Sequence, residues 1–270
     1  MPKIKVPAPP VPDQLKPQPK RPGKEYGPQT PVEQGAEAGA SAVNWIDERT
    51  SLSGAARWMM FRKVPKGTNW FYTLGSATMF AFLSQAVTGV FLAMYYTPSP
   101  TQAYDSVRHI NNDVFLGEFV HGMHKWGSSV MVVLIFLHMG RTFFFGAYKY
   151  PRELNWVIGV VLLILTMTMA FTGYLLPFDQ RSYWASIVGV NINGTGPIIG
   201  PYLSDFLRGG PYFGATTLSR FYAIHMLLVP GAIAALMGFH LYLVARLGTT
   251  APPWMKPKTA EALREETVST

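Results

Sequence analysis

The chain has no cysteine among its 270 residues, and only 14% of its residues are charged. The missing cysteine excludes disulfides, thiolate metal sites, iron–sulfur ligation and thioether-bound haem on this chain. The charged fraction is well below the roughly 25% that is usual in soluble domains, and 49% of the residues are hydrophobic. This balance argues against an ordinary soluble protein.

What the chain does have is long apolar runs. Four stretches reach the length of about 20 residues that a helix needs to cross a bilayer. They cover residues 72–96, 118–143, 155–176 and 218–245. No short apolar core with a cleavage site precedes the first stretch, so we expect no signal peptide. The sequence therefore predicts an all-α membrane protein built on a bundle of four transmembrane helices.

The remaining segments differ in composition. Residues 1–41 are rich in proline and lysine, which predicts a disordered tail. Residues 42–65 mix tryptophan and leucine with charges, which predicts an amphipathic helix on the membrane surface, with a short soluble helix as the alternative. Residues 66–250 then form the membrane domain, and residues 251–270 a C-terminal tail.

The net charge is +8, and the placement of the basic residues explains it. Lysine and arginine concentrate before residue 70, between the second and third stretches, and after the fourth. Cytoplasmic segments carry such an excess, so we expect both termini to be cytoplasmic, in a bacterial inner membrane. The partner of this charge is then the lipid bilayer, and we expect no nucleic acid. The long connection at residues 177–217 stays apolar, which predicts short helices packed on the membrane face.

Histidines stand inside two of the apolar stretches at matched spacings. His124 and His138 are fourteen positions apart, and His225 and His240 are fifteen apart. At 3.6 residues per turn, these spacings return to within about 40° and 60° of the starting direction, about 21 Å along the axis. The two helices run in the same direction, so His124 lies level with His225 near the outer side, and His138 with His240 near the inner side. Two facing imidazoles can hold an iron porphyrin as axial ligands, so the pattern predicts two haems.

Glycines repeat this spacing on the other two helices. Gly75 and Gly89 are fourteen positions apart in the first stretch, as are Gly159 and Gly173 in the third. Glycine leaves room where a flat macrocycle or another backbone comes close. Between the histidines of the fourth stretch, Pro230 could absorb the extra residue by kinking or unwinding the helix.

Other roles for these histidines stay open at this point. An intramembrane histidine also serves as a hydrogen-bonded helix contact or a proton relay, so a non-redox bundle is one alternative. His121 lies one turn before His124, but its seventeen-position spacing to His138 puts it about 100° off the shared face. We therefore expect a supporting role for His121, and a solvated position for His109 in the outer loop.

Longer motifs carry a resemblance to a known family. They are QAVTGVFLAMYYTP in the first stretch, HKWGSSVMVVLIFLHMGR in the second, YPRELNWVIGVVLLILTMTMAFTGYLLPFDQ in the third and LSRFYAIHMLLVPGAIAALMGFHLYLV in the fourth. With them, residues from about 43 to 250 resemble the N-terminal four-helix part of cytochrome b from quinol-oxidising bc complexes. The split form, cytochrome b6 of the b6f complex and its bacterial relatives, is the most similar, and the fifteen-position interval is a feature of that branch.

The resemblance implies two non-covalent b-type haems. It gives a lower-potential haem to His124 and His225 and a higher-potential haem to His138 and His240. Family arginines near the haem propionates match Arg141 and Arg220, where a guanidinium pairs bidentately with a carboxylate; lipid-headgroup contact is the alternative for each. His121 stands where the family usually has an arginine, so its propionate contact differs or depends on pH.

Quinone pockets also follow from the resemblance. The outer quinol-oxidation pocket would include the start of the long connection, at Pro177, Phe178, Tyr183, Trp184, Ala185 and Val188. Arg246 is the candidate for the inner quinone-reduction pocket. The PEWY segment that completes the outer pocket in the family is absent, so we expect a separate subunit-IV-like chain to supply it. Thr73 stands where chloroplast and cyanobacterial relatives carry the cysteine for an extra c-type haem, so no covalent haem c is expected.

The implied function is transmembrane electron transfer within a quinol:acceptor oxidoreductase, coupled to proton translocation. The chain would be a subunit of a quinol–cytochrome c reductase and not complete alone. Expected partners are a Rieske iron–sulfur protein and a c-type cytochrome or similar acceptor, in a homodimeric complex. The alternative is the diheme, quinone-reactive membrane anchor of a formate dehydrogenase or hydrogenase.

Overall fold

The computed structural model describes residues 31–50 and 67–254 of the chain. The chain divides into two units, Met1–Val64 and Pro65–Thr270. The predictions for residues 1–30, for residues 51–65 of the surface helix and for most of the C-terminal tail lie outside the described residues.

In the first unit, the helix α1 (Pro31–Thr50) begins earlier than the sequence pattern suggested. Residues 31–41, which composition predicted as part of a disordered tail, lie within this helix. The prolines and lysines of residues 1–41 stand mostly before residue 31, whereas the following residues include the helix formers Glu, Gln and Ala, and proline is favoured in a first helical turn. Near the end of α1, the guanidinium of Arg49 lies 4.1 Å from the centre of the Trp45 ring. The location of this helix on a membrane surface stays a prediction.

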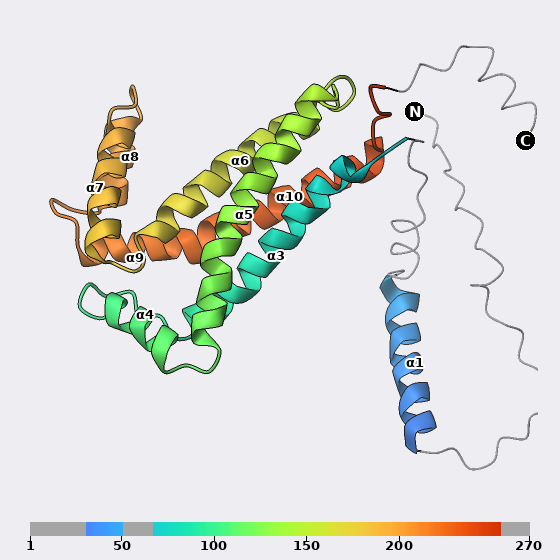
Figure 1. Ribbon diagram of the computed structural model, residues 1–270, viewed down its shortest axis with the longest axis horizontal. Helices are drawn as coiled ribbons and strands as arrows, with labels where there is room; N and C mark the ends of the chain where they lie inside the picture. The colour runs from blue at the N-terminus through green and yellow to red at the C-terminus, as the bar shows by residue number, and fades with distance from the viewer. Residues whose placement is uncertain (1–30, 51–66, 255–270) are drawn as a thin grey trace, which may run out of the picture. The chain divides into compact units, whose positions relative to one another are not determined.

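The second unit contains four helices long and apolar enough to span a membrane (Figure 1). The first is the short 3-10 helix η2 (Trp70–Thr73) followed by α3 (Leu74–Ala93). The second and third are α5 (Gly117–Phe144) and α6 (Glu153–Tyr174). The fourth joins α9 (Ala215–Ala223), η3 (Ile224–Leu228) and α10 (Val229–Leu247). No strand occurs in the described part of the chain, so the all-α, four-span prediction is confirmed and the chain is an integral membrane protein.

The outward faces of these helices are apolar. Phe80 and Val87 on α3 are 74% and 72% exposed, and Val133 on α5 is 58% exposed. Each such side chain would cost free energy in water and none in an acyl-chain environment. Lipid or a neighbouring apolar subunit is therefore the natural surrounding of the bundle.

The spans pack as two adjacent hairpins. α3 lies along α5, and α6 lies along α10 (Figure 1). The connections between spans place α4 (Ala103–Asn112), α7 (Gln180–Gly194) and α8 (Gly200–Arg208) at one end of the bundle, where α5 begins. The prediction of short helices in the long connection is confirmed, although their contact with a membrane face is still a prediction.

Local capping and a buried cluster hold the long connection in place. The side chain of Asp179 accepts a hydrogen bond from the Ser182 amide at 2.7 Å and so starts α7. Just before it, Phe178 has a left-handed backbone with φ of 51°. Four side chains from the end of α6, from α7 and from α9 are fully buried in one cluster, namely Leu175 just after α6, Val190, Leu218 and Phe221. The connection is therefore a packed part of the domain.

The fourth span absorbs its extra residue in a π turn. His225 lies in η3, where the amide of Val229 bonds to the carbonyl of Ile224, five residues back. Pro230 follows directly; it has no amide proton, and its ring clashes with the carbonyl four residues before it. The expected adjustment near Pro230 is thus a widened π turn on its N-terminal side, a form frequent at functional sites.

Candidate functional site

The structure brings the four membrane histidines together in two pairs. The ring centres of His124 on α5 and His225 on η3 are 6.3 Å apart, and those of His138 on α5 and His240 on α10 are 6.5 Å apart. The two rings of each pair are nearly perpendicular, at 74° and 79°. We refer to these as the 124–225 pair and the 138–240 pair.

The spacing within each pair suits a shared metal. A histidine nitrogen lies about 2.0 Å from a bound transition metal and about 1 Å from the centre of its own ring, so two rings on one metal have centres roughly 6 Å apart. Both observed distances match this requirement. In each ring of the 124–225 pair, Nδ1 already has a hydrogen-bond partner, which leaves Nε2 to face a metal.

The donor set suits a porphyrin rather than a bare metal ion. Within the described residues, no three side chains of His, Cys, Asp or Glu gather closely enough to hold a metal ion by themselves. A porphyrin supplies four ring nitrogens to its iron and needs only two axial ligands from the protein. A pair of imidazoles is therefore sufficient at each level.

Each predicted glycine lies directly against one of these imidazoles. A Cβ built on Gly173 would lie 2.5 Å from Cε1 of His225, and one on Gly75 would lie 3.0 Å from Cε1 of His138. The corresponding distances are 3.2 Å for Gly89 to His124 and 3.7 Å for Gly159 to His240. The fourteen-position repeat on α3 and α6 thus makes room for the histidine rings themselves, a closer role than the general clearance that the sequence suggested.

The two pairs differ in what their Nδ1 atoms contact. Nδ1 of His124 lies 2.9 Å from the Thr88 hydroxyl, and Nδ1 of His225 lies 3.0 Å from the Met169 carbonyl. Among the described residues, Nδ1 of His138 and Nδ1 of His240 are buried and have no hydrogen-bond partner. For His240 the backbone of Asn155 is nearby, but it does not meet the geometry of a bond. Hydrogen bonds such as those of His124 and His225 orient histidines that bind a metal.

Neither Thr88 nor Thr172 was among the residues predicted from the sequence. Each stands immediately before one of the glycines, as Thr88-Gly89 on α3 and Thr172-Gly173 on α6. The repeated Thr-Gly dipeptide is the signal that could have found them. The glycines near the 138–240 pair follow Leu74 and Ile158 instead.

The two predicted arginines pack against aromatic rings. The guanidinium of Arg141 lies 4.2 Å from the centre of the Tyr72 ring, and its Nε donates to the carbonyl of Phe71 at 3.3 Å. Arg220 donates to the carbonyl of Phe206 and lies 5.3 Å from the centre of that ring. Their contact with haem propionates stays a prediction.

His121 contacts α4 through its side chain. Its Nδ1 donates to the side-chain oxygen of Asn111 at 2.8 Å, which ties α5 to α4. His109 lies on α4, where it contacts Asp113 at 2.9 Å in an exposed position. His121 therefore joins α5 to α4.

The predicted quinol-pocket residues divide between two faces of the long connection. The Tyr183 ring lies 5.6 Å from Phe178 and 6.0 Å from Phe213, in an aromatic cluster. Pro177 is half-buried beside this cluster, whereas Trp184, Ala185 and Val188 are exposed on α7. Arg246, the predicted inner-pocket residue, is exposed near the end of α10.

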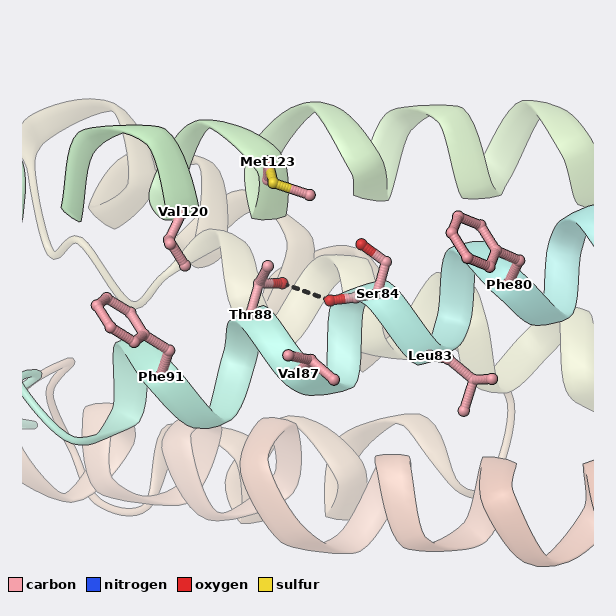
Figure 2. A pocket seen from close by; sticks show the side chains of 8 residues that line it. All are labelled: Phe80, Leu83, Ser84, Val87, Thr88, Phe91, Val120 and Met123. Carbon is pink, nitrogen blue, oxygen red and sulfur yellow. Dashed lines mark hydrogen bonds between the residues drawn. The ribbon is translucent and has the colours of Figure 1, made fainter. Parts of the chain in front are cut away.

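An apolar groove of about 460 Å³ lies on the outside of α3 and α5 (Figure 2). Its polar side chains are Ser84 and Thr88, and the Thr88 hydroxyl donates to the Ser84 carbonyl at 2.8 Å. The other lining residues are Phe80, Leu83, Val87, Phe91, Val120 and Met123. The groove adjoins the 124–225 pair through Thr88, and no motif in the sequence predicted it.

A four-span bundle with two facing pairs of imidazoles defines a class, the membrane proteins that bind haem between paired helices. Residues 59–248 match the family described as Cytochrome b/b6/petB. The chain belongs to the cytochrome b family, as its sequence motifs predicted, and family membership implies b-type haem.

Comparison with individual proteins agrees with this family assignment. The chain is 43% identical to cytochrome b6 of Heliobacterium modesticaldum over 212 residues, which cover 78% of this chain and 100% of the relative. It is 41% identical over 217 residues to the menaquinol:cytochrome c reductase cytochrome b subunit of Geobacillus thermodenitrificans, covering 77% and 97% of the two chains. A solved structure titled hyperthermophilic respiratory Complex III is similar, with a TM-score of 0.72 and 31% identity. That comparison covers 84% of this chain but only 63% of the other.

Proposed function

We propose that the chain is the diheme cytochrome b subunit of a quinol:electron-acceptor oxidoreductase. It carries electrons across the membrane, from an outer quinol-oxidation site to an inner quinone-reduction site, and the transfer is coupled to proton translocation. The family match and the similarity to subunits of menaquinol:cytochrome c reductase support this reading over the anchor of a formate dehydrogenase or hydrogenase.

One observation carries the proposal: two imidazole pairs occur in one bundle, with ring centres 6.3 and 6.5 Å apart. His124 and His138 are fourteen positions apart on the single helix α5, a separation of about 21 Å along its axis. Two levels of axial ligands at this separation support two haems, one near each side of the membrane.

Haem bound at each level supplies one-electron chemistry. The four imidazoles of the two pairs would hold it, and the glycines of α3 and α6 let the imidazoles lie close to the helix backbones. The apolar helices around the pairs keep water away, which influences the reduction potential. Arg141 and Arg220 are proposed to neutralise haem propionates, one at each level.

The quinone sites and partners complete the proposal. Phe178 and Tyr183 would line the outer pocket from the bundle side, and the exposed face of α7 with Trp184 and Val188 would meet a subunit-IV-like chain. Arg246 would lie at the inner pocket. A Rieske iron–sulfur protein and a c-type cytochrome would accept electrons in a homodimeric complex, with both termini of this chain on the cytoplasmic side.

The test replaces an axial histidine in the complex purified from its native membrane. We expect two haems b per chain in the unsubstituted complex, and one in His225→Leu, with loss of the lower-potential component in the reduced-minus-oxidised spectrum. His121→Leu is the matched control. His121 is another histidine of the membrane domain, but it contacts Asn111 on α4, so its loss should leave both haems. A complex with two unchanged haems in His225→Leu contradicts the proposal, as does a purified wild-type chain without haem.

The partner assignment has its own measurement. Purification through a tag on this chain should recover a Rieske protein and a subunit-IV-like chain, with quinol:cytochrome c reductase activity. Recovery of a molybdenum or nickel subunit instead would favour the membrane-anchor alternative.

A further inference from the structure

On α3, the residues next to the two imidazole pairs are placed alike but differ in one side chain. On α3, Gly89 faces His124 and Gly75 faces His138, and the residue before each glycine is buried: Thr88 is 6% exposed and Leu74 is 5% exposed. The same helix therefore offers a hydroxyl to one imidazole and a hydrocarbon to the other at equivalent places.

The hydrogen bonds around Thr88 have a fixed direction. The Thr88 hydroxyl has a single proton, and it donates this proton to the Ser84 carbonyl at 2.8 Å (Figure 2), with the Gln85 carbonyl at 3.2 Å. Its lone pairs are left to accept, and Nδ1 of His124 lies 2.9 Å away. Nδ1 of His124 is thus the donor, so the proton of the neutral ring is on Nδ1 and the free lone pair is on Nε2.

The 138–240 pair lacks this arrangement. Nδ1 of His138 is buried without a hydrogen-bond partner in the described part of the chain, as is Nδ1 of His240. A buried N–H without an acceptor leaves the imidazole less basic than one that donates to a hydroxyl or carbonyl. The two pairs therefore present electronically different axial ligands to the same cofactor.

We propose that Thr88 is a positioning residue that fixes the tautomer of His124 and lowers the reduction potential of the haem held by the 124–225 pair relative to that of the 138–240 pair. A more basic imidazole stabilises ferric over ferrous iron, so an accepted Nδ1–H bond shifts the potential down. This inference rests on the proposed diheme function and adds to it a residue that creates part of the potential difference between the two levels.

The first test removes the hydroxyl with little change of shape. Thr88→Val should raise the midpoint potential of the 124–225 centre and leave the 138–240 centre unchanged. We expect about a tenfold change in the ratio of oxidised to reduced haem at a fixed ambient potential, which equals about 59 mV for a one-electron couple. Thr88→Ser retains the hydroxyl and should keep the original potential.

The second test adds a hydroxyl at the equivalent place. Leu74→Thr puts an acceptor beside Nδ1 of His138 and should lower the potential of the 138–240 centre, whereas Leu74→Val, with the same shape and no hydroxyl, should not. This pair keeps the proposal testable if Thr88→Val assembles without haem. It also separates a hydrogen bond from a change in packing.

Equilibrium redox titration of the purified complex is the measurement, with low-temperature electron paramagnetic resonance to follow the geometry of each centre. Equal midpoint shifts in Thr88→Val and Thr88→Ser would overturn the inference, as would no shift in Thr88→Val. No effect of Leu74→Thr beyond that of Leu74→Val would also overturn it. In each of these outcomes two haems titrate and the diheme function stands; a wild-type complex that lacks haem would instead defeat the proposed function itself.

Discussion

The 124–225 pair and the 138–240 pair are built on the same helices but are fixed by different means. In the first pair, hydrogen bonds from both Nδ1 atoms and the close approach of Gly173 hold the rings. In the second, both rings are half-buried, and their buried Nδ1 atoms have no hydrogen-bond partner within the described residues. One bundle can therefore hold two copies of a cofactor in unequal environments by changing only a few side chains.

The backbone differs between the two pairs as well. On the side of α5, His124 and His138 lie in one regular helix. On the other side, His225 lies in a π turn and His240 in a regular helix. A change in helix register should therefore affect the two sides of the bundle differently.

The largest effect is expected from deleting one residue of α5. Removal of Val133, an exposed residue between the two histidines, rotates His138 relative to His124 by about 100°. One imidazole pair can then no longer form, and the complex should contain one haem instead of two, measured by pyridine assay. Deletion of Leu227 is the control, because it is also exposed but belongs to the π turn.

The Leu227 deletion should be tolerated. It brings His225 and His240 to the fourteen-position spacing already present in α5, and a regular helix can replace the π turn. We expect two haems in this variant. Loss of a haem on removing Leu227, with both kept on removing Val133, would show that the π turn does not carry the extra residue.

A smaller effect is expected from adding a methyl group at the glycines. Gly173→Ala places a Cβ 2.5 Å from Cε1 of His225, whereas Gly159→Ala places one 3.7 Å from Cε1 of His240, an ordinary contact. Overpacking of this kind costs about 1–3 kcal/mol, which is about 5- to 150-fold in an equilibrium constant. Gly173→Ala should therefore lose haem from the 124–225 centre at a lower detergent or temperature stress than the wild type.

Gly159→Ala should retain the wild-type haem content under the same stress, since its added methyl group fits. Spectra recorded through a thermal ramp would compare the two variants directly. If Gly159→Ala lost haem as readily as Gly173→Ala, the distances to the imidazoles would not be the controlling factor.

The sequence predicted the spans and the histidine pairing because both depend on periodicity. Runs of apolar residues set the four helices, and the spacing of His124 to His138 fixed one face of α5 without reference to any neighbour. The fifteen-position interval on the fourth span was recognised as a mismatch near Pro230, but whether a kink or a wider turn absorbs it depends on backbone hydrogen bonds that a spacing does not reveal.

Contacts made between helices were harder to predict. The Thr88 hydroxyl meets His124 across 36 positions in the chain, and His121 bonds to Asn111 across a loop. Composition also did not predict that α1 begins at Pro31, because the prolines before residue 31 dominate the composition of residues 1–41. The sequence also did not show which face of α7 is buried, because this depends on where α6 lies. Ser186 and Val190 are buried, whereas Trp184 and Val188 are exposed.

The smallest effect is expected at Thr172, the counterpart of Thr88 on α6. Its hydroxyl lies 3.4 Å from Nδ1 of His225, but that nitrogen already donates to the Met169 carbonyl at 3.0 Å. Thr172→Val removes the longer contact and leaves the shorter one, so the proton stays on Nδ1. The midpoint potential of the 124–225 centre should shift upward by clearly less than in Thr88→Val, in the same redox titration. A shift as large as that of Thr88→Val would mean that the Thr172 hydroxyl, and not the carbonyl, sets the basicity of His225, and the two Thr-Gly dipeptides would then act equally.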